Sequence, residues 1–217
     1  EIMPSLVGSE MCIRDRMNFH SDQCDYVGLL CLHPAKSGGA SLIASSITIY
    51  NEMQKRRPDL ADLLCKIFYF TKHGEVKEGE DPFYCMPIFA FHDGYLSIRA
   101  GGAHVRKAQS LPGVPQFTES DIEALDMFQE LAKELYMPMD FEVGDIQFLH
   151  NHVMLHTRTA FEDFDEKEKK RHLMRLWLTD PEGRPTPPGF RENICGIEVD
   201  GTVYTAPLDM QEGAGAD

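Results

Sequence analysis

The sequence predicts a mainly β protein with a few inserted helices. Short apolar or alternating segments recur along most of the chain, whereas a long helical stripe is clear only over residues 118–136. An Asp-Gly pair at 93–94, between two alternating segments, is typical of a β-hairpin. The segments do not alternate between strand and helix as βαβ units would. These observations favour an antiparallel barrel or sandwich.

Most strands are predicted from short apolar runs. The expected strands lie at 27–32, 41–44, 67–71, within 87–99, at 141–143, 146–155 and 172–179. Ser45 or Ser46 can cap a helix that runs to about Arg57, and Pro58 ends it and opens a second helix over 60–66.

The helix expected over 118–136 has an apolar stripe at helical spacing. The stripe consists of Ile122, Leu125, Phe128, Leu131 and Leu135. Ser120 and Glu123 have the spacing of a capping box at its start.

Length and charge limit the number of domains and the kinds of binding partner that the chain can have. The chain has 217 residues, which suits one domain of about 150 residues with additional segments. It carries 21 Lys and Arg against 35 Asp and Glu, a net charge of −14, which argues against binding to nucleic acid or to an anionic membrane surface. Six scattered cysteines without a C-x-x-C pair are typical of reduced thiols, so we expect a cytoplasmic protein.

The two ends of the chain differ from its middle. Residues 1–16 lack apolar periodicity and resemble translated sequencing-adapter read-through, so they are interpreted as a non-native or disordered leader. The Pro- and Gly-rich segment 181–217 is expected to be an irregular tail. The catalytic domain is therefore placed at 17–180.

Three groups of residues carry potential chemistry. His20 and Asp22 have i, i+2 spacing, so in an extended segment both side chains face one side and can reach one metal ion. A surface His/Asp pair is the alternative. His150, His152 and His156 share a parity in one strand-like run, so any of them could be a third ligand; a partly buried histidine at a sheet rim is the alternative.

Arginines supply the third group. Arg171 and Arg175 share one face of the last expected strand with Leu173 and Trp177. Arginines beside apolar groups need anionic partners, either a ligand or a carboxylate of the protein itself. Two His and one carboxylate suit non-haem Fe(II), which keeps positions open for a 2-oxo acid and O₂.

Taken together, these motifs resemble the TauD/TfdA-type (taurine dioxygenase-like) Fe(II)/2-oxoglutarate-dependent dioxygenases. The resemblance runs from about residue 18 to residue 178. It is carried in order by F-H-S-D (19–22), S-G-G-A-S-L (37–42), G-D-I-Q-F-L-H-N-H (144–152), L-H-T-R-T-A-F (155–161) and R-H-L-M-R-L-W-L (171–178). Asn151 and His156 match the family's N-x-x-x-x-H spacing, which selects His156 over His150 and His152.

The resemblance implies roles for six residues. His20, Asp22 and His156 would be the iron ligands. Ser41 would hydrogen-bond 2-oxoglutarate and Arg171 would bind its distal carboxylate, while Arg175 would serve an acidic substrate group or frame the co-substrate. The implied fold is a double-stranded β-helix (jelly roll), incomplete at the N-terminus because only 19 residues precede His20.

The implied function is hydroxylation of a small organic metabolite, coupled to oxidative decarboxylation of 2-oxoglutarate to succinate and CO₂. Fe(II) would be the cofactor, with 2-oxoglutarate and O₂ as co-substrates. Arg175 hints that the primary substrate is anionic, and neither its identity nor the oligomeric state follows from the sequence. The alternative is a non-catalytic jelly-roll binding protein or an inactive fragment.

Overall fold

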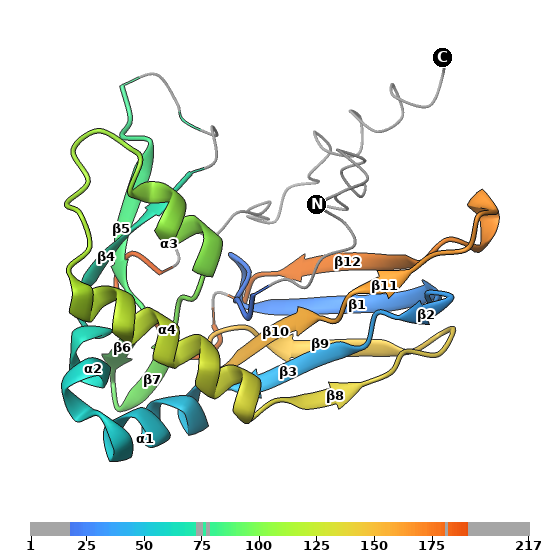
Figure 1. The fold of residues 1–217 in the computed structure, drawn as a ribbon, viewed down its shortest axis with the longest axis horizontal. Helices are drawn as coiled ribbons and strands as arrows, with labels where there is room; N and C mark the ends of the chain where they lie inside the picture. The colour runs from blue at the N-terminus through green and yellow to red at the C-terminus, as the bar shows by residue number, and fades with distance from the viewer. Residues whose placement is uncertain (1–17, 73–75, 77–78, 181, 191–217) are drawn as a thin grey trace.

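The computed structural model describes residues 18–72, 76, 79–180 and 182–190. The leader predicted at 1–16 lies outside the described residues, and of the predicted tail only 182–190 are described. The described chain is mainly β with inserted helices, as predicted. Figure 1 shows a half built from sheets beside a half that carries the helices and two hairpins.

Two antiparallel three-stranded sheets form the first half. One has the order β12-β1-β9 and the other β10-β3-β8. Their strands are β1 (Tyr26–His33), β9 (Ile146–His150), β12 (His172–Leu178), β3 (Ser41–Ser45), β8 (Met137–Met139) and β10 (Met154–Arg158). Ser41 Oγ on β3 donates to Gln147 Oε1 on β9 at 3.1 Å, so the two sheets face each other.

A short two-stranded ladder extends this half. It consists of β2 (Ser37–Gly38) and β11 (Phe161–Glu162). Gly38 and Gly39 have φ of 69° and 76°, as a turn requires. A one-turn 3₁₀ helix, η1 (Lys167–Lys169), precedes β12.

The second half packs helices against two hairpins. Its elements are α1 (Ser46–Arg56), α2 (Pro58–Leu63), α3 (Gly102–Ala108), α4 (Glu119–Glu134), β4 (Ile67–Thr71), β5 (Phe83–Pro87), β6 (Phe89–His92) and β7 (Tyr95–Ile98). The Asp93-Gly94 turn of the predicted hairpin is confirmed, with both residues at positive φ. Phe19, just before the H-x-D motif, is 1% exposed in the large apolar cluster that this half shares with β3 and β10.

Helix α4 differs from the sequence expectation in two details. Its capping box is formed by Thr118 and Asp121 rather than by Ser120 and Glu123. Ile122 is 41% exposed, and the buried stripe includes Ala124 and Ala132 instead. The stripe is therefore rotated slightly towards the small residues, which let α4 approach its neighbours closely.

The segment 146–155 was predicted as one strand, and this prediction is wrong. A turn at 151–153 ends β9 and starts β10, and the two strands belong to different sheets. The turn is held because Asn151 N donates to the Asp25 carbonyl and Val153 N donates to the His150 carbonyl. The shared parity of His150, His152 and His156 consequently has no structural meaning.

The two faces of the β12-β1-β9 sheet differ. Trp177, Val27 and Leu149 form one inner row across the sheet, and Arg175, Leu29 and Gln147 form the next. The predicted shared face of Arg175 and Trp177 is thus confirmed, and it is the face towards the second sheet. On the outer face, five large apolar side chains are at least 37% exposed, namely Ile146, Phe148, Met174, Leu176 and Leu178.

No helix in the described ranges has the length and hydropathy needed to cross a membrane.

Candidate metal centre

His20 and His156 meet across an isolated bridge between two extended segments. His20 N donates to the His156 carbonyl at 3.1 Å, and His156 N donates back to the His20 carbonyl at 2.9 Å. Residues that pair in this way project their side chains on the same side. The two imidazole rings lie 4.4 Å apart, centre to centre.

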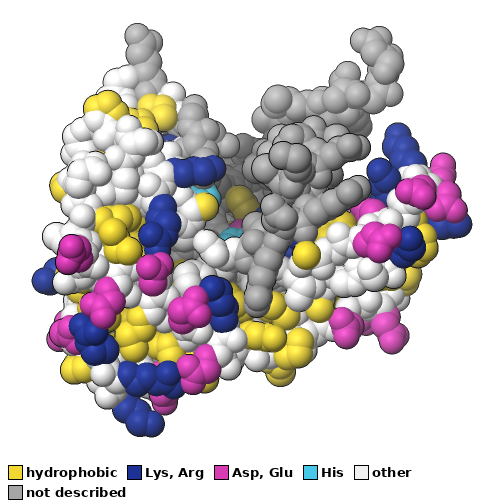
Figure 2. Space-filling view, viewed as in Figure 1, with side chains coloured by type: hydrophobic (Ala, Val, Ile, Leu, Met, Phe, Trp, Pro, Cys, Tyr) yellow, Lys and Arg dark blue, Asp and Glu magenta, His cyan; other side chains and the backbone are white. Residues whose placement is uncertain are grey.

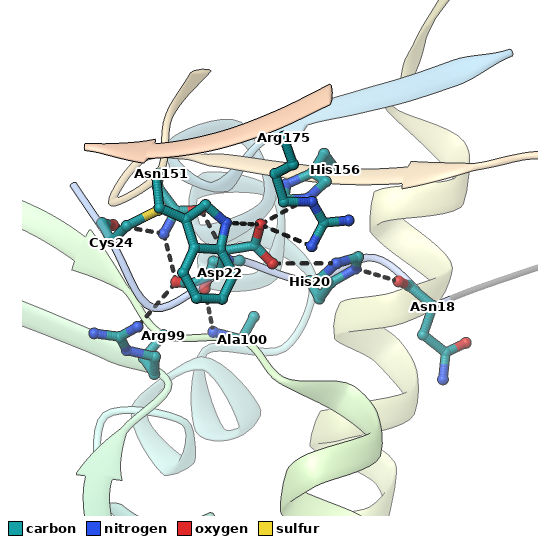
Figure 3. A network of polar contacts seen from close by, with 11 residues as sticks. Asn18, His20, Asp22, Cys24, Arg99, Ala100, Asn151, His156 and Arg175 are labelled. Carbon is teal, nitrogen blue, oxygen red and sulfur yellow. Dashed lines mark hydrogen bonds and ion pairs between the residues drawn. The ribbon is translucent and has the colours of Figure 1, made fainter. Parts of the chain in front are cut away.

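Asp22 completes a cluster with these histidines (Figure 3). Its Oδ1 lies 3.7 Å from His20 Nε2, and its Oδ2 lies 3.7 Å from His156 Nε2. One ligand atom from each residue lies within 4.8 Å of the others. In the described part of the chain, this is the one group of at least three His, Cys, Asp or Glu with such spacing. The structure therefore brings together the three residues that the sequence predicted as metal ligands.

The donor set fits a transition metal. Both ring nitrogens of His156 are buried and have no hydrogen-bond partner among the described residues. A buried polar atom without a partner needs an explanation, and a bound ion is one. His20 Nδ1 lies 3.0 Å from the Asn18 carbonyl, which fixes that nitrogen as the donor and leaves Nε2 free to ligate.

The protonation states also suit ligation. Burial lowers the pKa of His156 to about 3, with the charge of His20 acting in the same direction. The imidazole is then neutral, which is the form that binds metals. Burial opposes ionisation of Asp22, but His156, Arg175, His20 and the Trp177 indole N–H together bring the Asp22 pKa below its usual value. A carboxylate from Asp22 and a neutral imidazole from His156 are thus available at neutral pH.

This pKa shift predicts an acid instability of the metal-free protein. The folded state holds His156 neutral down to about pH 3, whereas an unfolded histidine takes up a proton near pH 6.5. The unfolded state therefore binds more protons between these values, and stability falls as the pH is lowered through that window. From pH 7.5 to pH 5, His156 should lower the free energy of unfolding by up to about 2 kcal/mol, at roughly 1.4 kcal/mol per pH unit.

Urea unfolding of the chelator-treated protein at the two pH values measures this difference. His156→Leu should lose that part of the pH dependence, and His92→Gln, a change in the β6–β7 hairpin, should keep it. Equal pH dependence in wild type and His156→Leu would show that His156 is not held neutral.

Arg175 and Trp177 reach the cluster from the inner face of β12. Trp177 Nε1 donates to Asp22 Oδ2 at 2.8 Å, and Arg175 Nη1 lies 3.4 Å from the same oxygen. The Arg175 side chain is 43% exposed, so it also borders open space beside the cluster. Of the two partners that the sequence left open for Arg175, the structure thus shows a carboxylate of the protein.

Arg171 lies further along, where β12 begins. Its guanidinium is half-buried, contacts the Gly39 carbonyl at 3.4 Å and lies over the Phe161 ring at 5.2 Å. Burial lowers the pKa of Arg171, and the nearby charge of Arg158 lowers it further. In the described ranges, the Arg171 guanidinium has no ion pair with a carboxylate, so a positive charge is available there for an anion.

Ser41 is buried on the same side of the β10-β3-β8 sheet as His156. Ser41 lies opposite Arg158 on β10, and Ile43, two residues on, lies opposite His156. The Ser41 hydroxyl is engaged by Gln147. It is therefore close to the two-sheet interior, and in this structure its hydrogen atom points to a protein acceptor.

His150 and His152 do not join the metal cluster. His152 Nε2 lies 2.6 Å from Asp25 Oδ1, and both side chains are buried. The His150 ring lies 4.9 Å from that of Tyr26, on the outer side of the sheet. Both histidines follow the alternative considered from the sequence, that of partly or fully buried structural residues.

Residues distant in sequence hold the H-x-D segment, and sequence reasoning missed them. Arg99 Nη1 donates to the Asp22 carbonyl at 2.9 Å, and Gln129 bonds the backbone of Phe19. Neither residue belongs to a recognisable motif, so no local signal could have found it. In the space-filling view, histidine side chains are visible in the hollow between the two halves (Figure 2).

Comparison with known proteins agrees with this geometry. The family described as "Taurine catabolism dioxygenase TauD, TfdA family" matches residues 9–177. The chain is 34% identical over 191 residues to FR-33289 synthase of Streptomyces rubellomurinus, covering 85% of this chain and 56% of that protein. It is 32% identical to the taurine hydroxylase-like protein SAT17 of Stachybotrys chartarum, covering 81% of this chain and 46% of that protein. The chain thus spans about half the length of the curated relatives it matches.

Solved structures share the fold. An asparagine oxygenase in complex with Fe(II), 3-hydroxyasparagine and succinate has a TM-score of 0.60 at 20% identity, over 76% of this chain and 50% of that one. The non-heme iron oxygenase OrfP in complex with Fe and alpha-ketoglutaric acid has a TM-score of 0.57 at 17% identity, over 76% of this chain and 50% of that one. Since the family match covers more than half of its residues, the chain belongs to the TauD/TfdA family of dioxygenases.

Proposed function

We propose that this chain is the catalytic part of an Fe(II)/2-oxoglutarate-dependent dioxygenase that hydroxylates a small organic metabolite. The observation that carries the proposal is the convergence of His20, Asp22 and His156, with both nitrogens of a buried imidazole lacking a partner among the described residues. Family membership and the iron and 2-oxo acid named for OrfP support it.

In this proposal His20, Asp22 and His156 would hold Fe(II). Two imidazoles and a carboxylate leave the remaining positions open for other ligands. When bound, iron together with 2-oxoglutarate and O₂ supplies the oxidising power, through decarboxylation of the 2-oxo acid to succinate and CO₂. The chain's own part is to keep His156 neutral and to orient Asp22 through the Trp177 indole.

Arg171 and Ser41 are proposed to bind the co-substrate. A guanidinium offers two parallel N–H groups to a carboxylate, and Arg171 lies without a carboxylate partner from the described chain. Ser41 faces the same interior and would exchange its bond to Gln147 for one to the ligand. Arg175, beside Asp22, would meet either the co-substrate or an anionic group of the primary substrate.

The architecture is consistent with a double-stranded β-helix. The two facing antiparallel sheets would be its two halves, and the cluster lies where segments of both come together. We propose residues 17–180 as the catalytic unit. A cytoplasmic location is proposed because four of the cysteines, Cys24, Cys31, Cys65 and Cys85, are free thiols.

Anaerobic titration with Fe(II), followed by 2-oxoglutarate, tests the proposal. Wild-type protein should bind one Fe(II), and 2-oxoglutarate should bind only to the iron form. His156→Ala should lose Fe(II) binding, whereas His92→Ala in the β6–β7 hairpin should bind as wild type. Equal Fe(II) binding by wild type and His156→Ala would contradict the proposed centre.

Gly39 offers a separate test of the Arg171 site. Gly39 has φ of 76°, and a Cβ there would lie 3.0 Å from Arg171 Nε and 3.3 Å from Phe161 Cβ. Gly39→Ala should therefore displace the guanidinium and weaken 2-oxoglutarate binding by about tenfold, equivalent to roughly 1.4 kcal/mol. Fe(II) affinity should be unchanged, because Gly39 does not contact the metal cluster.

Gly94→Ala is the matched control for Gly39→Ala. Gly94 has φ of 78° in the hairpin turn, and a Cβ there would have no atom within 4 Å. Both variants carry the same backbone strain, but only one touches Arg171. Equal weakening of 2-oxoglutarate binding in both would mean that strain, and not the guanidinium, is responsible.

A further inference from the structure

The segment that carries His20 and Asp22 has little support from regular strand pairing. Residues 18–25 belong to no strand of a sheet, and their ladder contacts are the isolated bridges of His20 to Gly101 and to His156. Ser21 adds two bonds to the backbone of Ala100. Within this segment, the backbone groups of Phe19 and Asp22 have no backbone partner among the described residues. Rotation of their peptide groups would move the side chains that must converge.

On one side of His20, a side-chain amide replaces the missing strand neighbour. Gln129, on helix α4, accepts from Phe19 N at 3.0 Å and donates through Nε2 to the Phe19 carbonyl at 2.9 Å. These two bonds satisfy both backbone groups of Phe19, as a neighbouring strand would. Phe19 itself is 1% exposed, so its side chain anchors the same point in the core.

On the other side, Asn151 does the same for Asp22. Asn151 Oδ1 accepts from Asp22 N at 2.9 Å, and Nδ2 donates both to the Asp22 carbonyl and to the Cys24 carbonyl, the latter at 2.8 Å. Asn151 is 1% exposed and lies in the turn between β9 and β10. Figure 3 shows its amide directed at the backbone beneath the Asp22 carboxylate.

We propose that Gln129 and Asn151 are positioning residues that fix the backbone on either side of the metal ligands. They form an amide clamp, by which we mean these two side chains and their bonds to Phe19, Asp22 and Cys24. The inference rests on the proposed metal centre. Neither amide touches the three ligand side chains, so each acts only through the direction in which His20 or Asp22 leaves the backbone.

The physical reason is the narrow tolerance of a metal site. Ligand distances must agree to within about 0.2 Å, so a small peptide rotation is enough to lose a ligand. Removing partners that orient ligands typically lowers metal affinity by about 10- to 100-fold. Asn151→Ala, which removes three bonds at Asp22 and Cys24, should fall in this range, and Gln129→Ala should fall near its lower end.

The experiment measures Co(II) binding by the full chain, by calorimetry and by the visible absorption of bound Co(II), which reports coordination geometry. Gln109→Ala is the matched control. Gln109 also bridges backbone groups, donating to the Pro115 carbonyl at 3.2 Å and accepting from Phe117 N at 2.7 Å, but in a loop away from the metal cluster. It should lower the melting temperature yet leave Co(II) affinity within about twofold of wild type, since no ligand moves.

The expected result is weaker Co(II) binding with an altered spectrum in Asn151→Ala and Gln129→Ala, and a wild-type spectrum in Gln109→Ala. If Asn151→Ala does not fold, Gln129→Ala decides, because Gln129 is partly exposed and borders a cavity of about 150 Å³ that can take the change. Wild-type affinity and spectrum in folded Gln129→Ala and Asn151→Ala would overturn the clamp while leaving the metal centre intact. Absence of Co(II) binding by the wild type would overturn the metal centre, and the clamp with it.

Discussion

Replacing Asp22 with alanine is expected to abolish succinate release and to weaken Fe(II) binding by more than about a hundredfold, the upper range for residues that merely orient a ligand. Asp22 is the sole carboxylate of the cluster and lies 3.7 Å from a nitrogen of each histidine. Without it, the two imidazoles remain, and the Arg175 cation loses its counter-charge. A cation without its counter-charge disfavours a metal ion bound beside it.

Asp22→Asn removes the negative charge of the side chain but keeps its size and shape. The amide can still accept from Trp177 Nε1, so the loop geometry should persist, but the negative charge is gone. We expect Asp22→Asn to be nearly as inactive as Asp22→Ala in an assay of succinate formation. Asp126→Ala, which removes an exposed carboxylate of α4 that pairs with Arg106 of α3, should be fully active. Undiminished succinate release from Asp22→Ala would show that Asp22 is not a ligand.

The elements predicted correctly are those that local sequence determines. The apolar run of β1, the cap at Ser45 and the proline at 58 act within a few residues, and β1, α1 and the start of α2 follow them closely. Helix α3 was missed because it begins at Gly101-Gly102, which disfavours a helix locally, so its packing against β4 must compensate.

The strand predicted over 146–155 is interrupted by a turn that depends on residues far away in the sequence. Nothing in Asn151-His152-Val153 differs strongly from a strand pattern, but the Asp25 carbonyl and the Asp22 peptide group bind Asn151 and bend the chain there. These partners lie more than 120 residues away in sequence. Periodicity over a few residues cannot register such contacts, so the turn was read as a continuation of the strand.

The metal cluster, too, depends partly on local sequence and partly on contacts between distant residues. The types and order of His20, Asp22 and His156 could be recognised through a resemblance, but their convergence depends on the backbone bridge between residues 20 and 156. Gln129 and Arg99 could not be predicted, because a lone amide in a helix or a lone guanidinium just after a strand has no sequence signature. These two residues matter because, in the folded chain, Gln129 donates to the Phe19 carbonyl and Arg99 donates to the Asp22 carbonyl.

Replacing Arg171 with alanine is expected to raise the apparent dissociation constant for 2-oxoglutarate by about 30-fold or more. Removing one partner of a buried charge pair typically costs about 2–5 kcal/mol, and each 1.4 kcal/mol is about tenfold in affinity. In the described structure the Arg171 guanidinium contacts the Gly39 carbonyl and the Phe161 ring but no carboxylate, which leaves its charge for a ligand. Fe(II) affinity should change little, because Arg171 is not within 4 Å of a cluster carboxylate.

Arg175 provides the comparison, because the structure gives it a different partner. Arg175 lies 3.4 Å from Asp22 and helps to keep that carboxylate ionised. Arg175→Ala should therefore affect the metal centre or the primary substrate more than the 2-oxoglutarate constant. If Arg175→Ala loses 2-oxoglutarate while Arg171→Ala binds it normally, the two roles are exchanged. If neither variant matters, the co-substrate site lies elsewhere and the oxygenase proposal loses its main support beyond the metal cluster.

Arg171→Lys then distinguishes charge from geometry in the anaerobic iron form. Lysine keeps the positive charge but cannot present two parallel N–H groups to a carboxylate, and its ammonium cannot stack on the Phe161 ring as a planar guanidinium does. The lysine variant should bind 2-oxoglutarate more tightly than Arg171→Ala and less tightly than wild type. Full recovery by lysine would mean that Arg171 acts as a point charge, whereas no recovery would mean that the forked contact accounts for the affinity.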